Sequence, residues 1–240
     1  MRRRAVVVAG HTGQETVARG ALHDPSPGAR ASALSALARM GSLQAHDIIR
    51  AMADPQEEVR RRACEVAGRR GRADLGPEMA MLLGELVIVL TDKAASVVEV
   101  ACYALGELGG GEQPAAAALS TVATGHGDPL CREAAVAALG ALGQPDGLAA
   151  VLSALGDKAA VRRRAVIALA GFEDAFDGDE VQGALRKAVN DPDWQVRQGA
   201  EDVLGQRTRP GPRPSPPRPA QTPPAQTPPA QTGPAQIGPA

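Results

Sequence analysis

The chain has 240 residues, a formal net charge of -1 and a hydrophobic content of 44%. Near neutrality argues against a protein that holds nucleic acid or an acidic membrane by bulk charge. Only 2% of the residues are aromatic, which leaves few platforms for stacking bases, sugars or flavins. The composition therefore indicates one sizeable core or a repeat array, packed mainly from small residues such as alanine and leucine.

The chain opens with three arginines and a short apolar stretch that ends at Ala9. This stretch is too short for a signal peptide, and the most apolar later segment, 81–90, is too short to span a bilayer. Three cysteines, Cys64, Cys102 and Cys131, match no metal-ligand spacing. They favour free thiols in the core of a protein in a reducing compartment, so we expect a cytoplasmic location.

The start of the chain resembles the inside of a repeat described below. Met1 aligns with Val59, and the three arginines that follow it align with residues 60–62. We therefore expect the chain to begin inside a helical hairpin whose first helix is missing, which would leave an uncapped apolar edge. Our hypothesis is that the reading frame continues upstream, and association through the uncapped N-terminal edge is the second explanation.

A turn that begins with aspartate recurs along the first 205 residues. The ten residues DPQEEVRRRA from Asp54 are echoed by DPDWQVRQGA from Asp191. In chain order the copies begin at Asp24, Asp54, Asp92, Asp128, Asp157 and Asp191. A period in the thirties predicts stacked helical hairpins.

Each copy predicts two helices. The aspartate, usually followed by proline, is expected to cap a helix whose apolar residues recur at three- and four-residue spacings. Glycines are expected to end these helices at Gly41, Gly71, Gly109, Gly143 and Gly171. The apolar segments that complete the hairpins are 43–52, 75–90, 115–122, 148–155 and 181–189.

The pattern Asp-Pro-x-x-x-Val-Arg-x-x-Ala, followed by Ala-Leu-Gly, resembles the HEAT repeat, in the short variety known from phycobilisome-lyase-like proteins. The resemblance covers residues 1–205. It implies an all-α fold: a right-handed α-solenoid, or superhelix, of HEAT-like helical hairpins, with a leading half repeat and about six hairpins.

The resemblance also implies that the turn aspartate and the helix arginine of neighbouring repeats pair as a ladder. The residues expected to form it are Asp24, Arg30, Asp54, Arg60, Asp128, Arg132, Asp157, Arg162, Asp191 and Arg197. Repeat three departs from the pattern, because Val98 stands at the arginine position and Lys93 at the proline position. We therefore expect the ladder to break there.

The resemblance implies that the second helices line a concave face. Arginine triplets occur at residues 2–4, 60–62 and 162–164 and offer candidate charged side chains for this face. Successive residues of a helix point in directions about 100° apart, so the three arginines of one triplet cannot all take part in the ladder. The candidates for partner binding on the concave face are Arg61, Arg62, Glu99, Glu133, Arg163 and Arg164. The two glutamates would repel a phosphate backbone, and the mixture of signs favours a protein or peptide partner.

Candidate catalytic groups are few. His23 and His46 are each followed by aspartate, but the di-iron centre of HEAT-built deoxyhypusine hydroxylases would need four such pairs at equivalent repeat positions. His11 and His126 lack an evident nucleophile or second ligand and are expected on the surface or in loops. Nothing marks a bilin pocket.

We therefore predict a non-catalytic scaffold or adaptor with no metal and no cofactor, which presents a concave, mixed-charge surface to a protein partner. The alternative is a HEAT-type enzyme or lyase subunit, either bilin-lyase-like or similar to a metal-dependent hydroxylase. A nucleic-acid binder is a further and less favoured alternative, because the single Trp194 is insufficient for the base flipping of HEAT-like DNA glycosylases.

From residue 206 onward the composition changes. No acidic residue occurs there, and 12 of the 20 prolines lie in this stretch. We expect a disordered tail rich in proline, alanine, glutamine and threonine at 206–240, after a solenoid at 1–205. Residues 213–219 fit an R-x-x-P-x-x-P pattern that SH3 domains bind, but proline-rich composition generates such matches by chance, and a spacer is the favoured explanation.

Overall fold

The computed structural model describes residues 2–70, 78–109 and 114–208. Within these ranges the chain forms helices and turns and no strand. The compact unit that contains them runs from Met1 to Thr208. Residues 206–208 of the predicted tail are helical, whereas its residues 209–240 and the predicted helix end at Gly71 lie outside the described residues.

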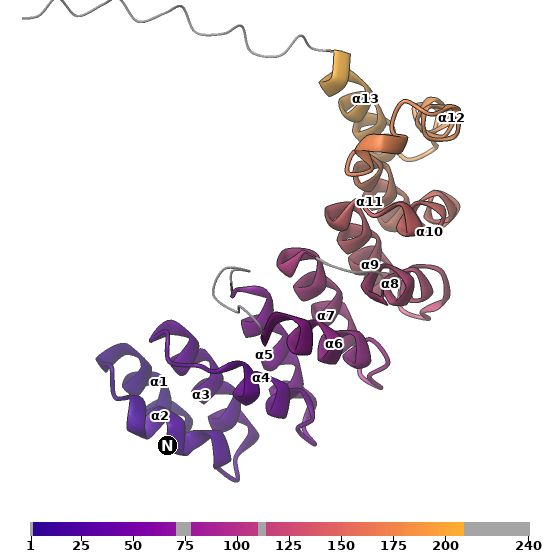
Figure 1. The fold of residues 1–240 in the computed structure, drawn as a ribbon. Helices are drawn as coiled ribbons and strands as arrows, with labels where there is room; N and C mark the ends of the chain where they lie inside the picture. The colour runs from indigo at the N-terminus through magenta and orange to yellow at the C-terminus, as the bar shows by residue number, and fades with distance from the viewer. Residues whose placement is uncertain (1, 71–77, 110–113, 209–240) are drawn as a thin grey trace, which may run out of the picture. The chain divides into compact units, whose positions relative to one another are not determined.

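The helices alternate between two rows (Figure 1). The row of motif helices, which carry the repeated arginine motif, consists of α1 (Arg2–Thr12), α3 (Pro27–Arg39), α5 (Glu57–Gly68), α7 (Ala95–Leu108), α9 (Pro129–Leu142), α11 (Ala159–Leu169) and α13 (Trp194–Thr208). The row of companion helices consists of α2 (Glu15–Gly20), α4 (Ala45–Met52), α6 (Met79–Val89), α8 (Pro114–Gly125), α10 (Leu148–Ala154) and α12 (Asp179–Ala188). Each motif helix packs against the next one, which confirms the predicted all-α solenoid. No helix of the described ranges combines the length and apolarity that a bilayer-spanning helix needs.

The turn aspartates act differently from our prediction. Asp54 lies two residues before Gln56, the N-cap of α5, and its carboxylate accepts a hydrogen bond from the Gln56 N–H at 2.9 Å. The expectation that these aspartates cap the helices is therefore wrong at Asp54, and it is correct at Asp128, the N-cap of α9. An aspartate in such a turn folds the chain back on itself before the helix begins.

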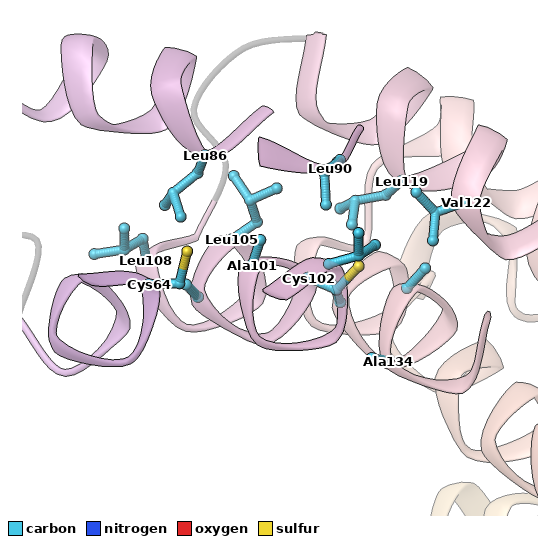
Figure 2. Packing of buried hydrophobic residues seen from close by; sticks show 14 of the residues in the cluster. Cys64, Leu86, Leu90, Ala101, Cys102, Leu105, Leu108, Leu119, Val122 and Ala134 are labelled. Carbon is cyan, nitrogen blue, oxygen red and sulfur yellow. The ribbon is translucent and has the colours of Figure 1, made fainter. Parts of the chain in front are cut away.

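The core between the two rows is made of small aliphatic side chains. Figure 2 shows leucines and alanines of α6 to α9 meeting there, together with the sulfur atoms of Cys64 and Cys102. All three cysteines are free and buried, and desolvation raises the pKa of Cys64 to about 12. These thiols therefore serve as small apolar side chains.

Neighbouring motif helices approach closely because glycine faces alanine across the interface. A Cβ atom added to Gly68, Gly106 or Gly140 would lie 3.0, 3.1 or 2.6 Å from the Cα atom of the facing alanine on the next motif helix. These contacts leave no room for a side chain. They set how near one repeat lies to the next.

We predict that Gly140→Ala destabilises the protein although alanine is the better helix former. The added methyl group meets both the Cα and Cβ atoms of Ala168 at 2.6 Å, and overpacking costs about 1–3 kcal/mol. The matched control is Gly84→Ala in α6, where nothing lies within 4 Å of the added atom. That control should gain up to about 1 kcal/mol. Urea unfolding followed by circular dichroism measures both, and equal effects of the two substitutions would contradict the close-packing explanation.

Candidate functional site

A ladder of arginine–aspartate ion pairs joins successive repeats. In each rung, Nε and Nη2 of an arginine donate to the two carboxylate oxygens of the next repeat's aspartate, at 2.6 to 2.9 Å. The four rungs are Arg30–Asp54, Arg60–Asp92, Arg132–Asp157 and Arg162–Asp191. The Nη1 atom of each arginine donates to a carbonyl oxygen of its own turn. One guanidinium therefore fixes two turns at once.

The rungs change the titration of their carboxyl groups. At Asp157 and Asp191 the hydrogen bonds from the arginine are the largest influence and lower the pKa below its ordinary value. At Asp54 and Asp92 burial is the largest influence and acts upward, but the arginine and a backbone N–H outweigh it, so the pKa is again lowered. The aspartates are therefore held in the charged form that the rung requires.

The ladder lacks a rung between α7 and α9, and the structure corrects our assignment there. Asp128 was expected to be the ladder acid, yet its carboxylate accepts from the Leu130 N–H at 2.9 Å as a helix cap. The turn position belongs to His126, whose Nδ1 accepts from the Asp128 N–H at 3.1 Å and whose carbonyl accepts from Arg132. Val98, at the arginine position, is fully buried. Both members of the rung are thus replaced together, arginine by valine and aspartate by histidine.

The two ends of the ladder differ from its middle. The Asp24 carboxylate accepts a hydrogen bond from the Ser26 N–H at 2.8 Å and lies 3.7 Å from Nη1 of the exposed Arg2. Arg197 donates to the carbonyl oxygens of Asp191 and Pro192 in its own turn. Asp24 and Arg197, both expected in the ladder, therefore lie at its ends without a bidentate partner among the described residues.

A buried ion cluster that sequence reasoning missed surrounds Asp47, the third residue of α4. Its side chain is 2% exposed, accepts from Arg19 and Arg50 at 3.2 Å each, and lies 3.2 Å from Nε2 of His46. It also accepts from the Gln44 N–H at the start of α4. The sequence signal was a capping box at residues 44–47. The described ranges contain no group of three His, Cys, Asp or Glu residues that could hold a metal ion.

The predicted partner-binding residues all lie on the motif helices, at exposed or half-buried positions. We call this surface the motif-helix face; it comprises Arg39, Arg61, Arg62, Glu65, Arg69, Arg70, Glu99, Val100, Tyr103, Glu107, Glu133, Arg163 and Arg164. Its placement on a concave surface remains a prediction.

The predicted arginines are already engaged within this face. Arg61 and Arg62 both pair with Glu65, while Arg164 pairs with Glu133 at 3.3 Å. Arg163 donates to the side-chain oxygen of Gln195 at 2.8 Å. The flanks of the face, on α5 and α11, are therefore basic but partly neutralised.

The centre of the face, on α7, carries a different chemistry. Glu99, Tyr103 and Glu107 follow one another at four-residue spacing, which places them along one side of the helix. Neither glutamate forms an ion pair with any residue of the described ranges. Tyr103 is 41% exposed; partial burial is the largest influence on its phenol and raises the pKa. The sequence analysis did not identify this group, although the tyrosine four residues from a glutamate on either side is visible in the sequence.

Two hollows lie side by side along the face. One, of about 640 Å³, lies between α3 and α5 and is lined by Ser35, Ala38, Arg39, Gly41, Leu43, Val66, Arg69 and Arg70. The other, of about 350 Å³, lies between α5 and α7 and is lined by Cys64, Glu65, Gly68, Arg69, Val100, Tyr103, Ala104 and Glu107. Their linings share Arg69. The first is basic and the second has an aromatic wall with acids at its edge.

Comparisons with known proteins agree with this architecture. A family model described as HEAT repeats matches residues 83–170. No curated protein matches the chain in sequence.

Solved structures with the same fold include a designed armadillo repeat protein in complex with the peptide (KR)4. It is 18% identical, with a TM-score of 0.56, and the match covers 78% of this chain and 96% of that one. An engineered protein is 17% identical, with a TM-score of 0.59, over 84% of this chain and 60% of that one. Human deoxyhypusine hydroxylase is 20% identical over 85% of this chain and 78% of that one, but its TM-score of 0.43 carries no argument about activity.

We predict that the missing rung can be rebuilt. Val98→Arg alone should destabilise the protein because it buries an unpaired cation. Adding His126→Asp supplies the carboxylate and should recover at least about 1.5 kcal/mol, the value of a hydrogen bond to a charged group. A double-mutant cycle from urea unfolding measures the coupling. If the two substitutions are simply additive, His126 does not occupy the ladder position.

Proposed function

The chain is a HEAT repeat protein, and we propose that it is a non-catalytic scaffold that binds a protein or peptide along the motif-helix face. The observation that carries the proposal is the row of half-buried, oppositely charged side chains across α5, α7, α9 and α11. Their mixed signs suit a partner with both acidic and basic groups. The designed armadillo protein with the same fold was solved with a peptide, which supports a peptide as one form of partner.

The setting of this function is part of the proposal. Three buried, free cysteines support a reducing, cytoplasmic location. The proposal also assigns binding to the predicted solenoid at 1–205 rather than to the predicted tail at 206–240.

Capture from a lysate of the source cells, read by mass spectrometry, tests the proposal. The parent chain is compared with a variant that reverses Arg61, Arg62, Arg163 and Arg164 to glutamate and with a version that ends at Thr208. The matched control is Arg186→Glu with Lys187→Glu on the companion helix α12, and circular dichroism checks that every variant is folded.

The proposal predicts a partner that the shortened chain and the α12 control retain and that the reversed variant loses. A partner that binds the reversed variant as well as the parent would contradict the assignment to this face. Partners lost only on shortening would place binding in the tail.

A further inference from the structure

We infer that the two adjacent hollows of the motif-helix face bind two side chains of one extended peptide, an arginine and an acidic residue three positions apart. This inference rests on the proposed function and names the class of partner. It is carried by the opposite chemistry of the hollows and by their separation of one motif helix.

The hollow between α5 and α7 suits an arginine. Gly68 and Ala104, whose Cβ and Cα atoms would approach to 3.0 Å, line it with little bulk. Tyr103 and Val100 supply an aromatic and an aliphatic wall. A guanidinium packs favourably over a tyrosine ring, and its planar fork matches a carboxylate.

The carboxylate for this guanidinium is Glu107. It is exposed, lines the hollow and forms no ion pair with a described residue. Glu65, on the opposite side of the hollow, is already held by Arg61 and Arg62. A bound arginine would therefore meet one unneutralised acid and one aromatic ring, while the cation of Arg69, which lines both hollows, would face the acidic residue of the same peptide. Lysine, as a compact and strongly hydrated charge, exploits the ring and the carboxylate less well.

The hollow between α3 and α5 suits a carboxylate. Arg39, Arg69 and Arg70 line it, and no acidic side chain of the described residues does. The Nη1 atom of Arg70 is buried and has no hydrogen-bond partner within the described part of the chain, which is an unfavourable state for a charged donor. An incoming carboxylate would supply an acceptor to these guanidinium groups.

The distance between the hollows fixes the spacing on the ligand. Packed helices lie about 8–10 Å apart. A peptide in the extended polyproline II conformation rises about 3.1 Å per residue and has three residues per turn, so its side chains at positions i and i+3 point to the same side, about 9 Å apart. One helix step therefore corresponds to three residues of such a peptide. The expected ligand carries an acidic residue and an arginine at positions i and i+3, in either chain direction.

Selection from a displayed library of random 12-residue peptides tests the inference on the full chain. The enriched peptides should share an acidic residue and an arginine three positions apart. In fluorescence titrations of these synthetic peptides, Tyr103→Ala should weaken binding about tenfold, whereas Tyr103→Phe, which keeps the ring, should retain it. Glu107→Arg and Arg39→Glu should each weaken binding at least as much.

A charge swap separates recognition from misfolding. Replacing the arginine of the peptide by glutamate should restore binding to the Glu107→Arg variant. The matched control Glu180→Arg, an exposed position at the start of α12, should bind as the parent does.

The outcomes distinguish the two proposals. Enriched peptides that bind the Tyr103→Ala and Arg39→Glu variants as tightly as the parent would overturn the two subsites, and the proposed scaffold function would stand if the captured partner still depends on the face. If no peptide is enriched and no partner depends on the face, both proposals fail.

Discussion

The bidentate arginine–aspartate rung is the interaction on which the arrangement of the repeats depends. Each guanidinium holds the carbonyl of its own turn and the carboxylate of the next turn. A hydrogen bond to a charged group contributes about 1.5–3 kcal/mol, which is modest beside the burial of the leucine and alanine core. The rung instead determines which turn lies opposite which, and so sets the register of neighbouring motif helices. Every surface formed between two repeats inherits that register.

Small residues then determine how deep those surfaces are. Gly68 and Gly106 let their helices approach the facing alanines to the limit of contact. Gly68 and Ala104 also line the hollow between α5 and α7, where their small size leaves space at the surface. The wider hollow between α3 and α5 has Ala38 and Val66 in its lining. Repetition of one helix pair thus produces adjacent hollows, and the variable residues at their edges give each a different chemistry.

Much of the fold could be predicted from the sequence, because the repeats reveal which positions face the same way in every copy. The hairpins and the rung arginines follow from the motif alone. The residue at the fourth turn position was predicted wrongly, because Asp128 resembles the motif aspartate but lies two residues further along the chain. The turn residue at Asp54 precedes its arginine, Arg60, by six positions, and the same interval before Arg132 leads to His126. The internal pairing of Arg61 with Glu65 was also missed, since it depends on side-chain positions that a pattern of residue types does not contain.

Hydrogen–deuterium exchange read by mass spectrometry tests most directly whether the rungs hold the repeats in register. We expect amides in the turn at 126–130, which receives no arginine from the preceding repeat, to exchange faster than those in the turns that begin at Asp54, Asp92, Asp157 and Asp191. Equal protection of the turn at 126–130 and the four turns with rungs would contradict it, and would assign the stacking of the repeats to the apolar core alone.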